Sequence, residues 1–69
     1  MRNVPANIRA ELARADRSVL EAADLLDIAM STWYRRMGKP RTWPLGDLAD
    51  LAEWLGIPLV RLFVNVAER

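Results

Sequence analysis

The sequence predicts an all-α fold, built as one compact domain of five short helices over residues 1–69. Three observations lead to this prediction. Alanine and leucine dominate the composition, with arginine, glutamate and aspartate between them, and this mixture favours helices. No segment shows the alternation of Val, Ile or Thr that is typical of a strand. The apolar residues recur instead at the three- and four-residue spacing of a helix face.

The first two helices have recognisable starts. Pro5 suits the first turn of a helix over residues 5–15. A second helix is expected over residues 18–26 and opens with a capping box. In this motif the Ser18 hydroxyl accepts a hydrogen bond from the backbone N–H of Glu21, and the Glu21 carboxylate accepts one from the N–H of Ser18.

Short turns set the bounds of the next two helices. Asp27 lies where the chain must turn, because aspartate tolerates the left-handed backbone conformation better than most residues. A third helix is expected from residue 29 or 30 to Gly38. Pro44 opens a fourth helix, which Gly56 ends in a Schellman motif.

The composition excludes several classes of function. The chain has no cysteine and no histidine, so it can form neither a disulfide nor a thiolate or imidazole metal site. Lys39 is the only lysine, no carboxylate pair stands out, and the glycines fit no phosphate-binding loop. We therefore expect no enzyme activity, no metal and no cofactor.

The chain carries no sign of a membrane segment. No apolar run approaches the ~20 residues that a membrane span needs. The N-terminus is too charged for a signal peptide, and the lack of cysteine fits a reducing compartment. These features predict a soluble protein of the cytoplasm.

One short segment, residues 30–44, concentrates positive charge and aromatic rings. It reads MSTWYRRMGKPRTWP, with four basic residues, two tryptophans and a tyrosine but no acid. The whole chain has a formal net charge of only +1. Basic residues without intervening acids favour a surface that meets phosphate. The alternative interpretation is a solvated charged loop.

Several motifs follow one another in an order typical of one family. They are Ala23 in the second helix, Ile28 after the turn, and the stretches Met30–Arg36 and Leu48–Pro58. Together they resemble the Cro/repressor-type helix-turn-helix family of phage and bacterial regulators, over roughly residues 6–63.

The resemblance implies a helix-turn-helix unit over about residues 18–38. It implies a sequence-specific transcriptional regulator of double-stranded DNA, a phage repressor or Cro-like protein in the cytoplasm of a bacterial host cell. A protein of Cro size is expected to have no small-molecule effector. The chain departs from the family pattern at Asp27, Ala29 and Arg36, where glycine, serine or threonine, and a hydrophobic residue are usual.

In this family the second helix of the unit enters the major groove, and its N-terminal residues face the base edges. A guanidinium such as that of Arg35 can bond both O6 and N7 of a guanine, with a phosphate contact as the alternative. The base-reading residues implied by the resemblance are Met30, Ser31, Thr32, Tyr34 and Arg35.

Contacts to phosphate position a protein on the duplex without reading its sequence. Trp33 is assigned to the core and Trp43 to bracing the loop before the fourth helix. Acids such as Asp47 and Asp50 are expected to keep the far side from binding DNA. The residues expected to contact the DNA backbone are Arg36, Lys39, Arg41, Asn7, Arg14, Arg17 and Ser18.

The fifth helix, which begins at Pro58, is expected to form a homodimer together with the tail, with binding to DNA as a monomer as the alternative. A single module buries only ~600–1,000 Å² of protein surface on DNA, and members of this family bind two-fold operators as dimers. The residues expected in the dimer interface are Val60, Phe63, Val64 and Val66.

Two other functions remain open at this point. An antitoxin-like or adaptor module would use an apolar surface or a tail to bind a protein. An excisionase-like architectural protein would bend DNA and bind it without a discrete two-fold operator.

Overall fold

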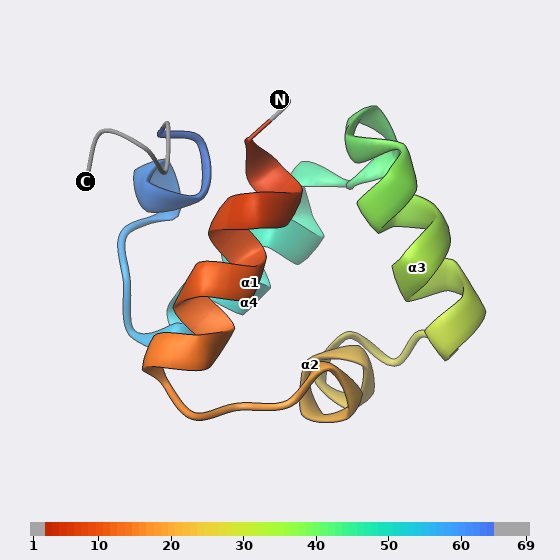
Figure 1. The fold of residues 1–69 in the computed structure, drawn as a ribbon, viewed down its shortest axis with the longest axis horizontal. Helices are drawn as coiled ribbons and strands as arrows, with labels where there is room; N and C mark the ends of the chain where they lie inside the picture. The colour runs from red at the N-terminus through yellow and green to blue at the C-terminus, as the bar shows by residue number, and fades with distance from the viewer. Residues whose placement is uncertain (1–2, 65–69) are drawn as a thin grey trace.

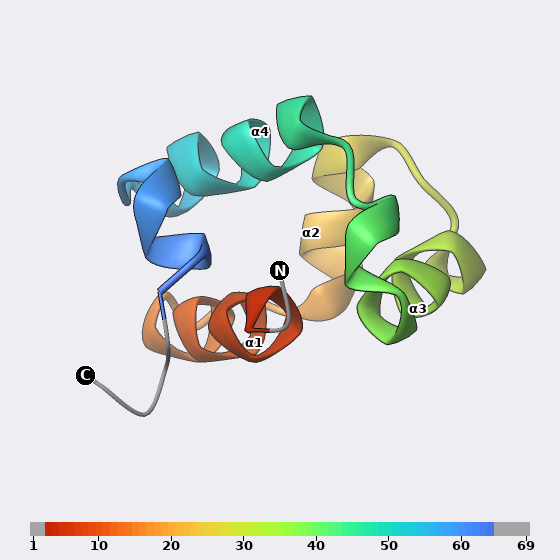
Figure 2. The same ribbon diagram turned by 90° about the horizontal axis from the view of Figure 1, so that it is seen from above.

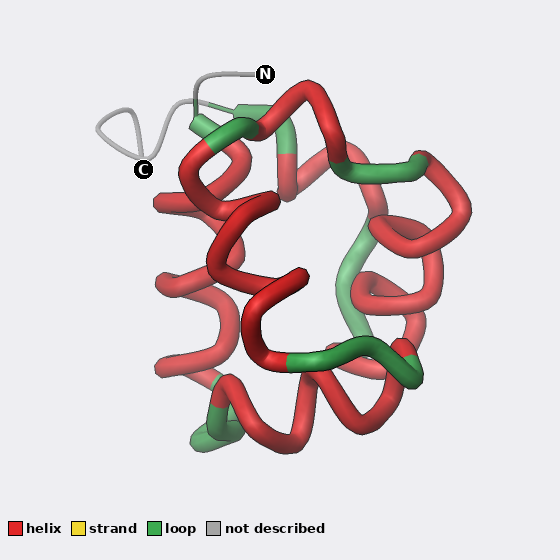
Figure 3. Tube along the Cα trace, turned by 90° about the vertical axis from the view of Figure 1, so that its right-hand side faces the viewer, coloured by secondary structure: helices red, strands yellow, loops and turns green. Residues whose placement is uncertain are grey.

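The computed structural model describes residues 3–64 of the chain (Figure 1). Every regular element in this range is helical (Figure 3), which confirms the predicted all-α class. The elements, in order, are α1 (Val4–Arg14), α2 (Val19–Leu26), α3 (Met30–Gly38), the 3-10 helix η1 (Pro40–Thr42), α4 (Leu45–Leu55) and the 3-10 helix η2 (Leu59–Leu62).

The predicted fifth α-helix is not found in the described residues. Pro58 does open a helical segment, but this segment is the 3-10 helix η2 and ends at Leu62. Helices of the 3-10 type rarely exceed three or four residues, and the β-branched Val60 and Val64 lower the helix propensity here. The rest of the expected helix, residues 65–69, lies outside the described residues. The prediction of five α-helices is therefore replaced by four α-helices and two 3-10 helices over residues 3–64.

The capping box at the start of α2 is confirmed. The Ser18 hydroxyl accepts a hydrogen bond of 3.0 Å from the backbone N–H of Glu21. The Glu21 carboxylate accepts one of 2.9 Å from the N–H of Ser18. Because these bonds satisfy two amides that the helix itself cannot pair, α2 can begin abruptly after a loop.

Two of the α-helices end at a residue in the left-handed conformation, as the sequence predicts. Asp27 has φ 56° at the end of α2, and Gly56 has φ 73° at the end of α4. In each case the N–H of the following isoleucine, Ile28 or Ile57, bonds back to a carbonyl of the last helical turn, at 3.1 and 3.0 Å. Both isoleucines pack against the core. This is the Schellman arrangement, in which the left-handed residue turns the chain and the next residue closes the core.

The core is assembled from all four α-helices together with the loop before α4 and η2. In Figure 2, α1 and α4 form two sides of the domain, η2 joins them at one end, and α2 and α3 lie at the other. In Figure 1, α1 lies in front of α4. The radius of gyration is 10.9 Å, close to the ~11 Å expected for a folded chain of this length. The fully or almost fully buried apolar side chains are Val4, Ile8, Leu12, Ala22, Ala23, Trp33, Trp43, Leu48, Leu51, Ala52 and Leu62.

A buried carboxylate fastens η2 to α1. Glu11 of α1 is only 2% exposed. Its carboxylate lies 3.1 Å from the Arg61 guanidinium of η2 and 2.9 Å from that of Arg14. A buried charge is tolerated only when it is paired, so the two arginines allow Glu11 to occupy a position on the inner side of α1.

The described helices are short. The longest, α1 and α4, have 11 residues each. Within residues 3–64 none is long and apolar enough to cross a membrane.

Two glycines of the same chain should respond in opposite ways to the same substitution. Gly56 has a positive φ and Gly46 lies in the first turn of α4, while neither would bring a new Cβ within 4 Å of another group. We expect Gly56→Ala to lower the free energy of unfolding by about 1 kcal/mol, because alanine is strained in the left-handed region. Gly46→Ala should raise it by about 0.5 kcal/mol, because alanine is the better helix former.

Urea unfolding of both variants followed by circular dichroism measures the two effects. A loss of stability in both variants, or in neither, would contradict this account of how α4 ends.

Candidate nucleic-acid interface

One face of α3 points away from the rest of the domain. Ser31, Tyr34, Arg35 and Gly38 are all exposed and recur at helical spacing, with Tyr34 60% exposed. On the opposite face Trp33 is completely buried. The helix lies at the outer edge of the domain in both Figures 1 and 2. It therefore presents a polar stripe that no other described element covers.

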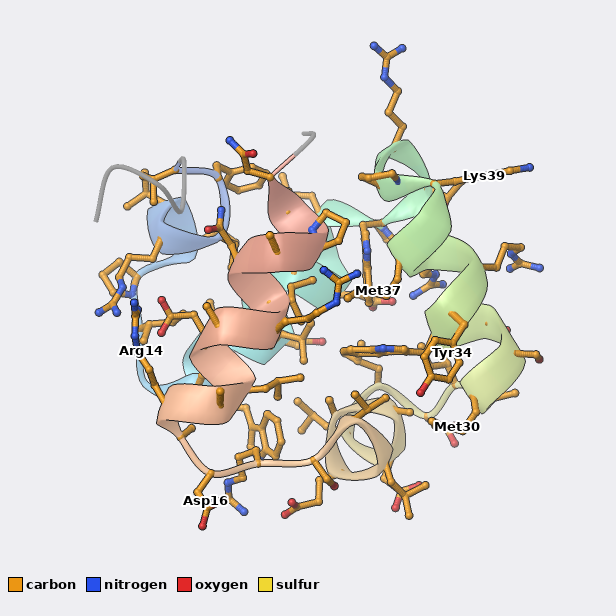
Figure 4. All side chains as sticks on the ribbon, viewed as in Figure 1. Arg14, Asp16, Met30, Tyr34, Met37 and Lys39 are labelled. Atoms are coloured by element: carbon orange, nitrogen blue, oxygen red, sulfur yellow. The ribbon has the colours of Figure 1, made fainter. Side chains whose placement is uncertain are left out.

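Three of the five predicted base-reading residues lie on this outward face, and two do not. Ser31, Tyr34 and Arg35 are exposed. Met30, at the first turn of α3 (Figure 4), is half-buried and packs against the core. Thr32 is half-buried as well. The readout role predicted for Met30 and Thr32 stays a prediction, and the residues on the outward face are Ser31, Tyr34 and Arg35.

Basic side chains continue this surface beyond the end of α3. Lys39 and Arg41 are exposed, and Lys39 extends outward from the top of α3 in Figure 4. The Thr42 hydroxyl donates a 2.7 Å hydrogen bond to the Lys39 carbonyl. This bond spans η1 and so restrains the backbone that carries both basic side chains.

Arg36 does not fit the predicted role of a phosphate contact. Its guanidinium donates a 2.7 Å hydrogen bond to Asp47 of α4, and its side chain is 15% exposed. The guanidinium carbon lies 5.4 Å from the centre of the Trp43 ring. The charges of Arg36 and Asp47 are thus paired with each other inside the domain.

Asn7 is also a correction to the predicted backbone contacts. This side chain is fully buried in α1. Its amide nitrogen donates a 2.9 Å hydrogen bond to the Leu62 carbonyl and a second to that of Val64. Since the chain after η2 needs donors for its carbonyls, Asn7 fastens that segment to α1 and is not available to a phosphate.

The remaining predicted backbone contacts have partners inside the domain but stay accessible. Arg14 pairs with the buried Glu11, and Arg17 pairs with Glu21 at 3.1 Å. The Arg17 guanidinium also lies 5.1 Å from the centre of the Trp54 ring. Both arginines remain about half exposed. The capping box uses the Ser18 backbone N–H as a donor and the Ser18 hydroxyl oxygen as an acceptor, so only the hydroxyl hydrogen of Ser18 is left to donate to a phosphate.

The cations that pair with no other described residue form a distinct set. Arg14, Arg17, Arg36 and Arg61 each face an acid. Sequence reasoning assigns no role to Arg9 of α1, because nothing in its sequence position distinguishes it from an ordinary surface residue. The exposed cations without an acidic partner among residues 3–64 are Arg9, Arg35, Lys39 and Arg41.

Of the residues predicted for a dimer interface, Val60 lies in η2, and Phe63 and Val64 directly follow it. Val60 is 62% exposed, Phe63 36% and Val64 37%. Val66 lies outside the described residues. Three exposed apolar side chains within five residues are compatible with a protein contact.

Comparison of the chain with protein-family models, with curated proteins and with solved structures gives no match.

The pKa of the Glu21 carboxyl offers a test of the geometry around the start of α2. The backbone N–H of Ser18, and then the Arg17 guanidinium, lower this pKa below its ordinary value of 4.5. A carboxyl whose pKa is lower in the folded state stabilises the fold above its unfolded-state pKa. That stabilisation is lost as the pH falls through the folded-state pKa.

We therefore expect a carbon-detected NMR titration to give Glu21 a pKa under 4.5. Glu21→Gln keeps the capping geometry but removes the charge, so wild type should be the more stable protein near neutral pH and lose that advantage in acid. A pKa at or above the ordinary value, or a pH-independent difference between the two proteins, would contradict the geometry described.

Proposed function

We propose that this chain is a sequence-specific, double-stranded DNA-binding regulator of transcription, of the helix-turn-helix, Cro/repressor type. The observation that carries the proposal is the outward face of α3 and its extension through η1. There the exposed Ser31, Tyr34 and Arg35 are followed by Lys39 and Arg41. None of these three cations has an acidic partner within residues 3–64.

The dimensions of α3 suit the proposed role. With its side chains an α-helix is about 10–12 Å across, which the major groove, ~12 Å wide, admits. The nine residues of α3 make a helix about 13.5 Å long. α2, the turn at residues 27–29 and α3 supply the two helices that the motif requires. In this arrangement the exposed face of α3 meets the base edges.

The chemistry of the outward face divides into reading and positioning. Arg35 can donate two hydrogen bonds to one guanine, and Ser31 can both donate and accept at a base edge. The Tyr34 hydroxyl is a further donor and acceptor. Lys39 and Arg41, beyond the helix, suit phosphate oxygens, because contacts to the backbone bind all sequences alike.

A homodimer completes the proposal. In a dimer that meets through Val60, Phe63 and Val64, each copy would offer one α3 helix to one half-site of a two-fold operator. All three side chains are exposed in the described chain, and their burial between two copies would remove apolar surface from water.

Substitutions on the proposed face should separate reading from positioning. Arg35→Ala should weaken binding to a duplex selected from a random pool by about 5- to 150-fold, the value of one bidentate base contact. Lys39→Ala and Arg41→Ala should weaken binding to selected and random duplexes alike. Each should also reduce the slope of log affinity against log salt by ~0.9. Fluorescence anisotropy across a salt series measures both quantities.

Arg35→Lys is the matched control, because it keeps the charge but not the fork of donors. It should lose specificity and retain the salt slope. The proposed readout by Arg35 is wrong if Arg35→Lys discriminates between duplexes as well as wild type does.

The proposed dimer implies a fixed number of protein chains on each DNA duplex. Sedimentation velocity should find two protein chains on each selected duplex at saturation. Val60→Asp places a charge in the proposed contact. Because the Val60 side chain is 62% exposed, this substitution should leave the monomer folded. This variant should weaken operator binding about tenfold or more, as burial of an unpaired charge is costly. One chain per duplex in the wild type would exclude the dimer.

A further inference from the structure

The position of α3 depends on few side chains. Trp33 is the one residue of this helix that is fully buried, while Met30 and Met37 pack against the core only in part. The helix packs mainly against α2 and η1. A single buried ring fixes where a helix lies more firmly than it fixes the rotation of the helix about that ring.

Arg36 supplies a direct side-chain bond from α3 to α4. Its guanidinium reaches Asp47 in the first turn of α4 at 2.7 Å. It also lies over Trp43, which precedes α4, and Trp43 meets Trp33 edge to face with 5.2 Å between the ring centres. Asp47, Arg36, Trp43 and Trp33 thus form one continuous line of contacts, which we call the α3–α4 brace.

The brace is suited to setting an orientation. Both charged side chains are largely withdrawn from water, at 15% and 28% exposure, so the cost of desolvation offsets much of their attraction. The hydrogen bond, in contrast, has a required distance and direction. Arg36 directly follows Arg35, and a rotation of α3 that broke the bond to Asp47 would move the Arg35 side chain as well.

We propose that Arg36 is a positioning residue for DNA recognition, which acts with Asp47 to hold the outward face of α3 at the angle that reads base edges. This inference rests on the proposed function. Arg36 would contribute to sequence specificity without contacting DNA. Asp47 would promote binding to DNA although it carries a negative charge.

The proposal can be tested by the direction in which DNA affinity changes when Asp47 is removed. Removal of an acid should strengthen binding to DNA if only net charge matters. If Asp47 positions α3, Asp47→Ala should instead weaken binding to a selected duplex by about fivefold or more, the lower bound for one bidentate base contact. Asp50→Ala is the matched control, because Asp50 is an exposed acid of the same helix without an ion pair among residues 3–64. It should bind the duplex as wild type does or slightly more tightly.

Arg36→Met separates positioning from phosphate contact. Methionine keeps an unbranched stem for packing against Trp43 but carries no charge. The variant should lose discrimination between selected and random duplexes and keep the wild-type salt slope. A slope reduced by ~0.9 would show a phosphate contact and overturn the proposal. Tighter binding by Asp47→Ala than by wild type would overturn it too.

A measurement without DNA distinguishes failure of this inference from failure of the proposed function. Residual dipolar couplings of the α3 amides report the direction of α3 relative to α4 in the free protein. Arg36→Met and Asp47→Ala should change these couplings, Asp50→Ala should not, and urea midpoints identify any variant that is simply less stable. Unchanged couplings would overturn the positioning role of Arg36 and Asp47, whatever the wild-type protein binds. Equal affinity of the wild-type protein for selected and random duplexes would instead refute the proposed function.

Discussion

The structure depends most on the burial of Trp33. α3 must leave one face free, so most of its surface cannot contribute to the core. Trp33 is completely buried and meets Trp43 edge to face, with the ring planes 85° apart. Burial of one large ring gives a short helix more apolar contact than any aliphatic side chain could provide. The two tryptophans of this segment, Trp33 and Trp43, therefore have a structural purpose, and they leave the polar side chains of α3 free for other contacts.

Buried polar side chains add specific contacts between helices, which the small apolar core alone does not provide. Asn7 and Glu11, both in α1, are almost inaccessible to water. The first binds the carbonyls of Leu62 and Val64, and the second binds the guanidinium of Arg61. Both interactions tie η2 to α1, just as Arg36 and Asp47 tie α3 to α4. Such bonds stabilise the fold modestly but specify one arrangement of short helices, because a buried polar group without its partner is costly.

Sequence reasoning predicted the features that depend on neighbours along the chain. The capping box at Ser18, the turn at Asp27 and the stop at Gly56 follow from local chemistry and are found as expected. Sequence reasoning assigns Arg36 and Asn7 to DNA because their partners, Asp47 and the Leu62 carbonyl, are 11 and 55 residues away. No local pattern shows such pairs. The basic segment at residues 30–44 could be recognised from its composition, but which of its cations are free depends on the packing of α3 against α4.

The affinity of the wild-type protein for DNA tests the central claim most directly. Labelled duplexes, one selected from a random pool and one of random sequence, are titrated by fluorescence anisotropy across a salt series. We expect the selected duplex to bind about 10³-fold or more tightly than the random one, with affinity falling steeply as salt increases. Equal affinity for both duplexes would indicate an architectural DNA-binding protein, and no binding at low salt would make the basic face of α3 a surface for another protein. Either result would contradict a sequence-specific regulator.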